Sequence, residues 1–108
     1  MKILNYTPHA IVVRLADGTD RAFPPSGVVA RVKTTDVPLE AVDGIPTVRM
    51  TFGEVEGLLP EEEGTICIVS SLVAQAAKDR RDLVAPNTGP TAIRENGQIV
   101  AVRGFQVF

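Results

Sequence analysis

Hydrophobic and polar side chains alternate along much of the chain with the two-residue period of β-strands. The clearest case is residues 47–52, where Val48, Met50 and Phe52 alternate with two threonines and an arginine. This pattern predicts a half-buried strand with those three side chains facing the core. Residues 53–57, which begin and end with glycine, suggest a bulged continuation. Residues 34–44 contain Pro38 and end in Asp-Gly, so we expect a loop or an irregular edge there.

Two Asx-Gly pairs predict hairpins with two-residue turns. Asp17-Gly18 would place Leu15 opposite Asp20 and Val13 opposite Ala22. Asn96-Gly97 would place Arg94 opposite Ile99 and Ile93 opposite Val100. Further strands are expected over residues 2–6, 28–33 and 104–108, and the returning strand of the first hairpin should stop at Pro24-Pro25.

One strand and one helix stand out as buried elements. Thr65–Val69 is almost entirely apolar, which is typical of a central strand covered on both faces. Ser70-Ser71 then offers a helix N-cap, and residues 72–79 have the periodicity of a short amphipathic helix. Hydrophobic residues make up 44% of the chain and aromatic residues only 5%, so aliphatic side chains must fill the core. We therefore predict one domain, residues 1–108, that is mainly β: a small antiparallel sheet or partly open barrel of about six to eight short strands with one helix.

Charge and composition argue against several classes of function. The net charge is −2 and the basic residues are dispersed, which does not fit a groove for a nucleic acid polymer. No apolar run is long enough to cross a bilayer, and the N-terminus lacks the pattern of a signal peptide. The single cysteine, Cys67, lies among isoleucines and suits a reducing compartment, so we expect a cytoplasmic protein. We expect no cofactor and no bound metal, because soft metal ligands are too few.

The strand-to-helix junction at Ser70 and Ser71 is the first candidate binding segment. The first amides of a helix have no intrahelical partners and carry partial positive charge, so a phosphate or carboxylate can bind there. Both hydroxyls could donate to the same oxygens. The structural alternative is that a serine simply caps the helix. A serine nucleophile is not expected, because the Gly-x-Ser-x-Gly motif is absent.

A second candidate segment follows at residues 87–91. Thr88 supplies a hydroxyl, Gly89 permits close approach of the backbone, and Arg94 could clamp a phosphate with two donors. A plain turn with a solvated arginine is the alternative. His9 is the only histidine; with Thr7 it could satisfy backbone groups in a turn or contact a ligand. The strand arginines Arg31, Arg49 and Arg103 would form a phosphate-binding surface only if several of them converged on one pocket.

Several segments together resemble a family of small proteins encoded by phages and prophages. The resemblance covers nearly the whole chain and rests on residues 5–9, 24–27, 68–74, 87–90 and 97–103 (NYTPH, PPSG, IVSSLVA, NTGP and GQIVAVR). Small phage proteins of this size often counter host immunity, by binding a host protein or by sequestering a nucleotide-derived signal in an oligomer. The resemblance therefore implies an anti-defence role.

Taken together, the leading hypothesis is a non-enzymatic homo-oligomer that sequesters a phosphate-bearing small molecule. Its ligand-binding residues would be Ser70, Ser71, Thr88, Gly89 and Arg94, with Asn5, Thr7, His9 and Arg103 nearby. One alternative is a structural or protein-interaction module, such as a minor virion component or an inhibitor of a host protein. A weaker alternative is a hydrolase of nucleotide signals that uses His9.

Overall fold

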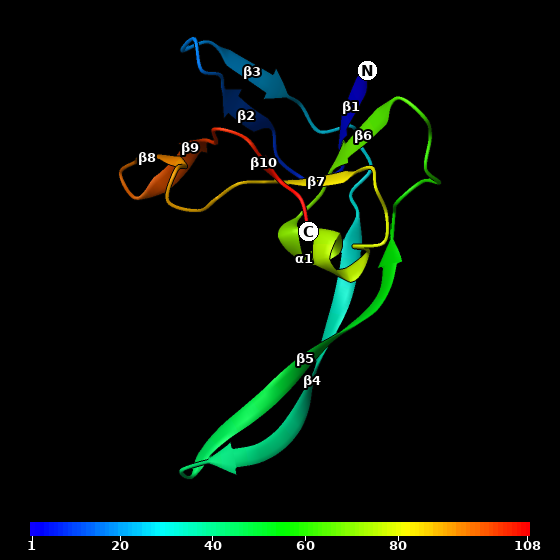
Figure 1. Ribbon diagram of the computed structural model, residues 1–108, viewed down its shortest axis with the longest axis vertical. Helices are drawn as coiled ribbons and strands as arrows, with labels where there is room; N and C mark the ends of the chain where they lie inside the picture. Colours follow the sequence, from blue (N-terminus) through cyan, green and yellow to red (C-terminus); the bar gives the residue numbers. More distant parts are fainter.

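The computed structural model describes all 108 residues and consists mostly of β-strands around one short helix (Figure 1). The mainly β class predicted from the sequence is confirmed, and the small sheets do not close into a barrel. The elements are β1 (Lys2–Asn5), β2 (Ile11–Arg14), β3 (Asp20–Phe23), β4 (Arg31–Val42), β5 (Ile45–Glu56), β6 (Thr65–Ile68), α1 (Ser71–Ala76), β7 (Leu83–Pro86), β8 (Ile93–Glu95), β9 (Gln98–Ala101) and β10 (Phe105–Gln106).

A four-stranded sheet in the order β1-β6-β7-β10 forms the centre of the body. Strands β1, β6 and β7 run parallel, and only β10 is antiparallel to its neighbour. As the apolar run predicted, β6 is central, and the side chains of Cys67 and Ile68 are buried. The mostly parallel pairing could not be anticipated, because it joins strands that are far apart in the sequence.

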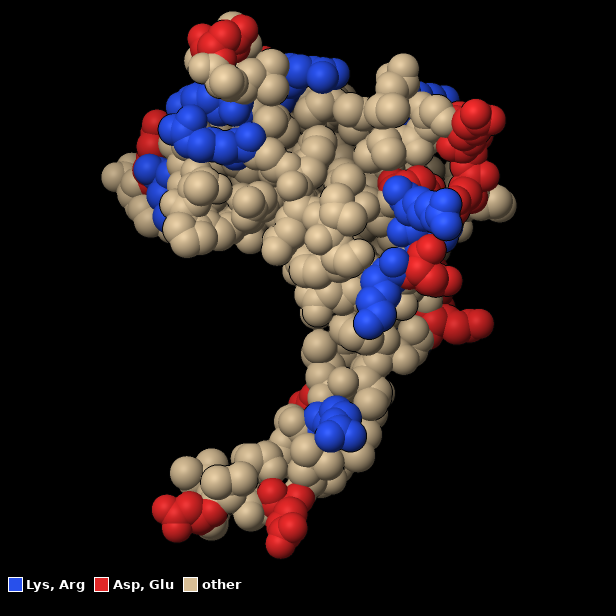
Figure 2. All heavy atoms as spheres, viewed as in Figure 1, with Lys and Arg blue, Asp and Glu red and all other residues tan.

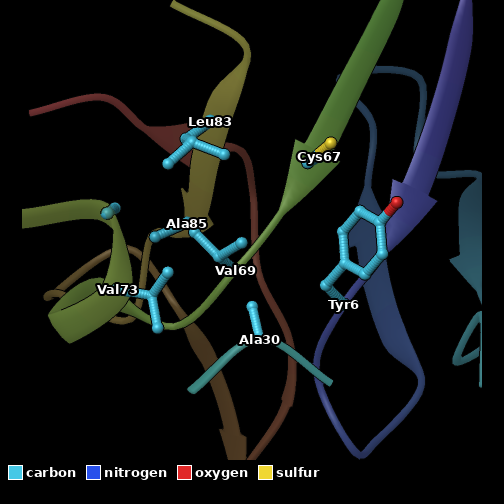
Figure 3. Close-up of a cluster of buried hydrophobic side chains, with 8 residues drawn as sticks. Tyr6, Ala30, Cys67, Val69, Val73, Leu83 and Ala85 are labelled. Atoms are coloured by element: carbon cyan, nitrogen blue, oxygen red, sulfur yellow. The ribbon is translucent and has the colours of Figure 1, made fainter. Parts of the chain in front are cut away.

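The core lies where this sheet meets α1. Val73 of the helix packs in one cluster with Val69, which follows β6, and with Ala85 of β7 (Figure 3). The remaining members of the cluster are Tyr6, Ala30, Cys67, Ala74 and Leu83. Most of these side chains are small, which agrees with an interior filled by aliphatic groups and no tryptophan.

The hairpin β2–β3 differs by one residue from the predicted register. Arg14 lies opposite Asp20, and Val13 lies opposite Arg21 rather than Ala22. The backbone N–H of Leu15 donates to the carbonyl of Thr19, so the loop has three residues and not two. The Asp17 carboxylate explains the longer loop, since it accepts from both the N–H and the hydroxyl of Thr19.

The hairpin β8–β9 keeps the predicted turn but not the full register. Arg94 lies opposite Ile99 as expected, and Asn96 and Gly97 both have the positive φ angles that this tight turn requires. Ile93, however, lies opposite Ala101 rather than Val100, because the register shifts between Ile93 and Arg94. The shift marks a bulge, which a pattern of alternating side chains does not reveal.

The helix and the last strand are both shorter than expected. The helix ends at Ala76 rather than Asp79, and the Arg80 N–H donates to the carbonyl of Ala77 in a tighter turn. The predicted strand 104–108 is regular only at Phe105 and Gln106. No helix of the structure is long and apolar enough to cross a membrane.

Strands β4 and β5 form a long two-stranded ribbon, which we call the arm. It leaves the body beside α1 and extends away from it (Figure 1). Residues 34–44, predicted as a loop or an irregular edge, form most of β4 and the turn of this hairpin. The irregular edge is confirmed, because β4 pairs on one side only and its register shifts between Leu39 and Val42. The turn is Asp43-Gly44, both with positive φ, and Pro38 is tolerated because β4 pairs with a neighbour on one side only. The arm explains the radius of gyration of 16.2 Å, against about 13 Å for a compact chain of this length.

The predicted burial of β5 is wrong for the single chain. Val48, Met50 and Phe52 lie in a strand, as the pattern indicated, but they are 53%, 44% and 37% exposed. The predicted bulge is confirmed, since the register shifts where Gly53 and Glu54 lie opposite Lys33. An alternating pattern shows that one face of a strand should be covered, but it does not show what covers it.

Gly57, just after β5, should be the most sensitive glycine of the chain. It has a φ of +91°, and an added Cβ would lie 2.4 Å from the carbonyl oxygen of Val29. We expect Gly57→Ala to lower the free energy of unfolding by about 2–4 kcal/mol, measured by urea denaturation. Gly18→Ala is the matched control, because Gly18 has a similar φ of +87° with open space around it. Equal losses in the two variants would contradict the close approach of Val29.

Candidate functional site

Three of the sequence-predicted segments lie at one edge of the central sheet, where β1, β6 and β7 end. Because β1, β6 and β7 are parallel, the segments that follow them leave the sheet at the same end. These segments are residues 5–9 after β1, Ser70-Ser71 after β6, and residues 87–91 after β7. Ligands of open parallel sheets bind at the carboxyl ends of the strands, so this edge is the natural candidate site.

The residues after β1 hold the fold together rather than face a ligand. The side-chain amide of Asn5, only 2% exposed, donates to the carbonyls of His9 and Phe23, each at 2.8 Å. Its oxygen accepts from the N–H of Thr7 at 2.9 Å and from the Thr7 hydroxyl at 2.6 Å. The polar side-chain groups of Asn5 and Thr7 are therefore hydrogen-bonded within the protein. His9 is exposed, and its carbonyl is the part engaged in this network.

Ser70 caps the helix, as the structural alternative proposed. Its hydroxyl oxygen accepts from the N–H of Val73 at 3.3 Å, and its carbonyl accepts from the N–H of Ala74 at 3.0 Å. The hydroxyl proton is left to donate elsewhere. Ser71 is the first helical residue and its side chain is exposed. The cap thus fixes the position of Ser70 without consuming its donor.

A hollow of about 220 Å³ lies beside this cap, and it includes a residue that the predicted site left out. Its polar side chains are those of Ser70 and Arg31, the latter at the start of β4. The rest of the lining is apolar, formed by Pro8, Val29, Ala30, Val32, Leu72 and Val73. Arg31 was recognised only as one of three strand arginines, because no local signal shows that β4 begins next to the helix.

The other two strand arginines do not join Arg31. Arg49 lies on the arm opposite Val37, and Arg103 is an exposed residue in the bend after β9. Of the three strand arginines, only Arg31 therefore lines this hollow, which we call the hollow beside Pro8.

The segment after β7 lines a different hollow. Thr88 borders a space of about 180 Å³ formed mainly by apolar residues of β2 and β9. Arg94 donates to the backbone carbonyl of Thr88 at 3.1 Å, and the side-chain oxygen of Asn87 accepts from the Gly89 N–H at 3.2 Å. The two hollows share no lining residue. The single site predicted from the sequence therefore divides into two neighbourhoods.

A buried ion pair lies just before the amino end of β7, next to Cys67 of β6. Arg80 donates to both carboxylate oxygens of Asp82, at 2.9 and 2.6 Å, and Asp82 is buried. These hydrogen bonds hold the pKa of Asp82 below its ordinary value. Burial, and next the Asp82 charge, raises the pKa of the Cys67 thiol to about 11. The thiol is therefore protonated at neutral pH, which fits a packing role.

The ion pair of Arg80 with Asp82 should make the free energy of unfolding depend on pH. Because the pKa of Asp82 is lower when folded, its contribution is present above the unfolded pKa of about 4 and is lost as the pH falls through the folded value. We expect Asp82→Asn to lose about 3 kcal/mol of unfolding free energy at pH 7 and progressively less below about pH 4.

Urea denaturation at a series of pH values measures this difference. Asp20→Asn is the control, because the ion pair of Asp20 with Arg14 lies on the surface and should contribute little. A loss in Asp82→Asn that stays constant down to strongly acidic pH would contradict the role of the ion pair.

The side chains at this edge of the sheet determine which ligands it can bind. No group of three or more His, Cys, Asp or Glu side chains lies close enough to hold a metal ion. The hollow beside Pro8 offers one guanidinium, one hydroxyl and an apolar lining, which suits an anion attached to an apolar or aromatic body. Comparisons of the chain with protein-family models, with curated proteins and with solved structures find no match.

Proposed function

We propose that this chain is a non-enzymatic, homo-oligomeric protein that captures a small phosphate-bearing molecule in the hollow beside Pro8. The observation that supports this most directly is that Arg31 and Ser70 line one hollow at the carboxyl edge of the parallel strands. The resemblance to small phage proteins suggests the biological setting: the ligand would be a nucleotide-derived signal of host immunity, held in the host cytoplasm.

Each group of the hollow has a defined part in this proposal. The Arg31 guanidinium would donate to two phosphate oxygens, and the Ser70 hydroxyl would donate to a third. The exposed side chain of Leu72, together with Val29, would cover the apolar part of the ligand.

The arrangement favours binding over hydrolysis. Ser70 already accepts a hydrogen bond from Val73, and the residues that line the hollow contain no carboxylate or imidazole to act as a base. His9 lies one residue beyond Pro8 but does not line the hollow. A hydrolase would need His9 to act on the ligand, which makes His9→Ala the variant that tests this weaker alternative.

A protein-interaction module is the second candidate, and the arm favours it. An exposed two-stranded ribbon with apolar side chains is a usual feature of proteins that bind other proteins. In that case the chain would be a virion component or an inhibitor of a host protein, and the hollow beside Pro8 would be dispensable.

Native mass spectrometry with a panel of cyclic, linear and ADP-ribose-derived nucleotides tests the proposal. We expect stoichiometric gain of intact ligand, and a loss of affinity of about 10- to 100-fold in Arg31→Ala. Arg49→Ala is the matched control, because that arginine is on the arm. Arg94→Ala tests which of the two hollows holds the ligand. It should bind with the affinity of the wild type if the hollow beside Pro8 is the site.

Other results would point elsewhere. Recovery of an altered ligand, abolished by His9→Ala, would indicate the hydrolase. Binding that depends on Arg94 and not on Arg31 would move the site to the loop after β7. No gain of mass across the panel would contradict ligand capture and leave the protein-interaction module.

A further inference from the structure

The arm carries an apolar face that begins in the core and continues into solvent. At its base, Val32 and Val55 lie opposite each other and pack against the core cluster. Farther out, Phe52, Met50 and Val48 follow on β5 at every second residue. We call these three side chains and their partners Thr34, Asp36 and Pro38 the arm face.

The bulge at the base keeps the arm face on the same side as the core pair. Gly53 and Glu54 together lie opposite Lys33, so the pairs on either side of them, Val32–Val55 and Thr34–Phe52, share a side of the ribbon. A Cβ built on Gly53 would lie 3.7 Å from the Cβ of Lys33, which agrees with this placement. Without the bulge, Phe52 and Val55, which are three residues apart, would lie on opposite sides of the ribbon.

This face is not covered by the chain itself. Besides the three β5 side chains, the arm exposes Val37 and Leu39 on its opposite face and Val42 and Ile45 next to its turn, each by 43% or more. A two-stranded ribbon alone is only marginally stable in water and needs a third strand or a packed face. The extended arm therefore requires a partner whenever it is folded.

The surface shape shows where such a partner would lie. Figure 2 shows a hook, with the arm curving away from the body, and most of its inner edge carries no charged group. Charged side chains lie along the outer edge, at the tip and, in smaller number, across the middle of the arm. The arm face itself carries one charged residue, Asp36, so covering it would remove a single charge from water.

We propose that the arm face docks on a second copy of this chain, the arm of each copy lying in the hook of the other. A second copy fits better than a foreign protein, because the arm needs cover as soon as it folds and only another copy is present wherever the chain is made. The arrangement is isologous, since each copy both gives an arm and receives one.

The area available is sufficient for a stable dimer. Strands of 12 residues extend about 40 Å, and a two-stranded ribbon is about 10 Å wide, so one face covers about 400 Å². Each copy would bury its own arm face and a similar area that receives the partner's arm. The sum, about 800 Å² per copy, is the size of a standard specific interface. This inference specifies the interface of the homo-oligomer in the proposed function, and it does not depend on the ligand in the hollow beside Pro8.

The mass of the protein in solution tests the proposal directly. We expect light scattering coupled to gel filtration to give at least twice the chain mass of 11.5 kDa. Met50→Lys should weaken self-association by at least about 100-fold, because it adds a charged group that must lose water when the arm face is covered. The new lysine would lie opposite Asp36, so the ribbon of the single chain gains a favourable cross-strand pair.

The control variant is Thr51→Lys, which places the same charge on the neighbouring residue and the other side of the ribbon, opposite Thr35. We expect it to retain most of the self-association. A wild-type protein that is folded and has the mass of one chain at submillimolar concentration overturns the proposal. So does equal weakening by the two variants, which would mean that general charge and not the arm face matters.

A cysteine variant identifies the surface even if Met50→Lys misfolds. Val48→Cys places a thiol on the arm face, while the native Cys67 is buried and its pKa is raised to about 11, so it stays unreactive. A maleimide should label residue 48 far more slowly than in the unfolded chain, because the second copy covers the arm face. Labelling as fast as in the unfolded chain would contradict a covered arm.

Discussion

The buried side chain of Asn5 fixes the centre of this molecule. It joins the end of β1 to His9 and to the end of β3 through two donated hydrogen bonds, and it holds Thr7 through two accepted ones. Its backbone carbonyl accepts from Ser26, and the carbonyl of the next residue, Tyr6, accepts from Ala30. Replacing the amide would leave several buried backbone groups without partners, each costing about 1–3 kcal/mol.

Both features of interest depend on this network. Ala30 is the residue before β4, so the bonds around Asn5 and Tyr6 place the base of the arm beside α1. They also bring Pro8 and Arg31, which are distant in sequence, to one hollow with Ser70. The body around the network is small, since only 16 of the 108 residues are buried. A core of that size leaves a long arm little support from its own chain.

The sequence predicted local structure well and long-range structure poorly. Turn pairs such as Asn96-Gly97, the prolines that end β3 and the apolar run of β6 act over a few residues and were interpreted correctly. The parallel pairing of β1, β6 and β7 was not foreseen, because no local pattern specifies it. Arg31 was therefore not assigned to a site, and the residues around Arg94 were assigned to the same site as Ser70. The alternation in β5 correctly predicted a strand, but the side chains that it assigned to the core are exposed in the single chain.

Amide hydrogen exchange of the arm tests the central claim most directly, namely that β4 and β5 are covered in solution. Exchange would be followed at residues 34–52 over a wide range of protein concentration, with the amides of β6 as the internal reference. The account predicts strong protection of the arm at high concentration and a loss of that protection on dilution, while β6 stays protected. Rapid exchange of the arm at every concentration, beside a protected β6, would contradict it.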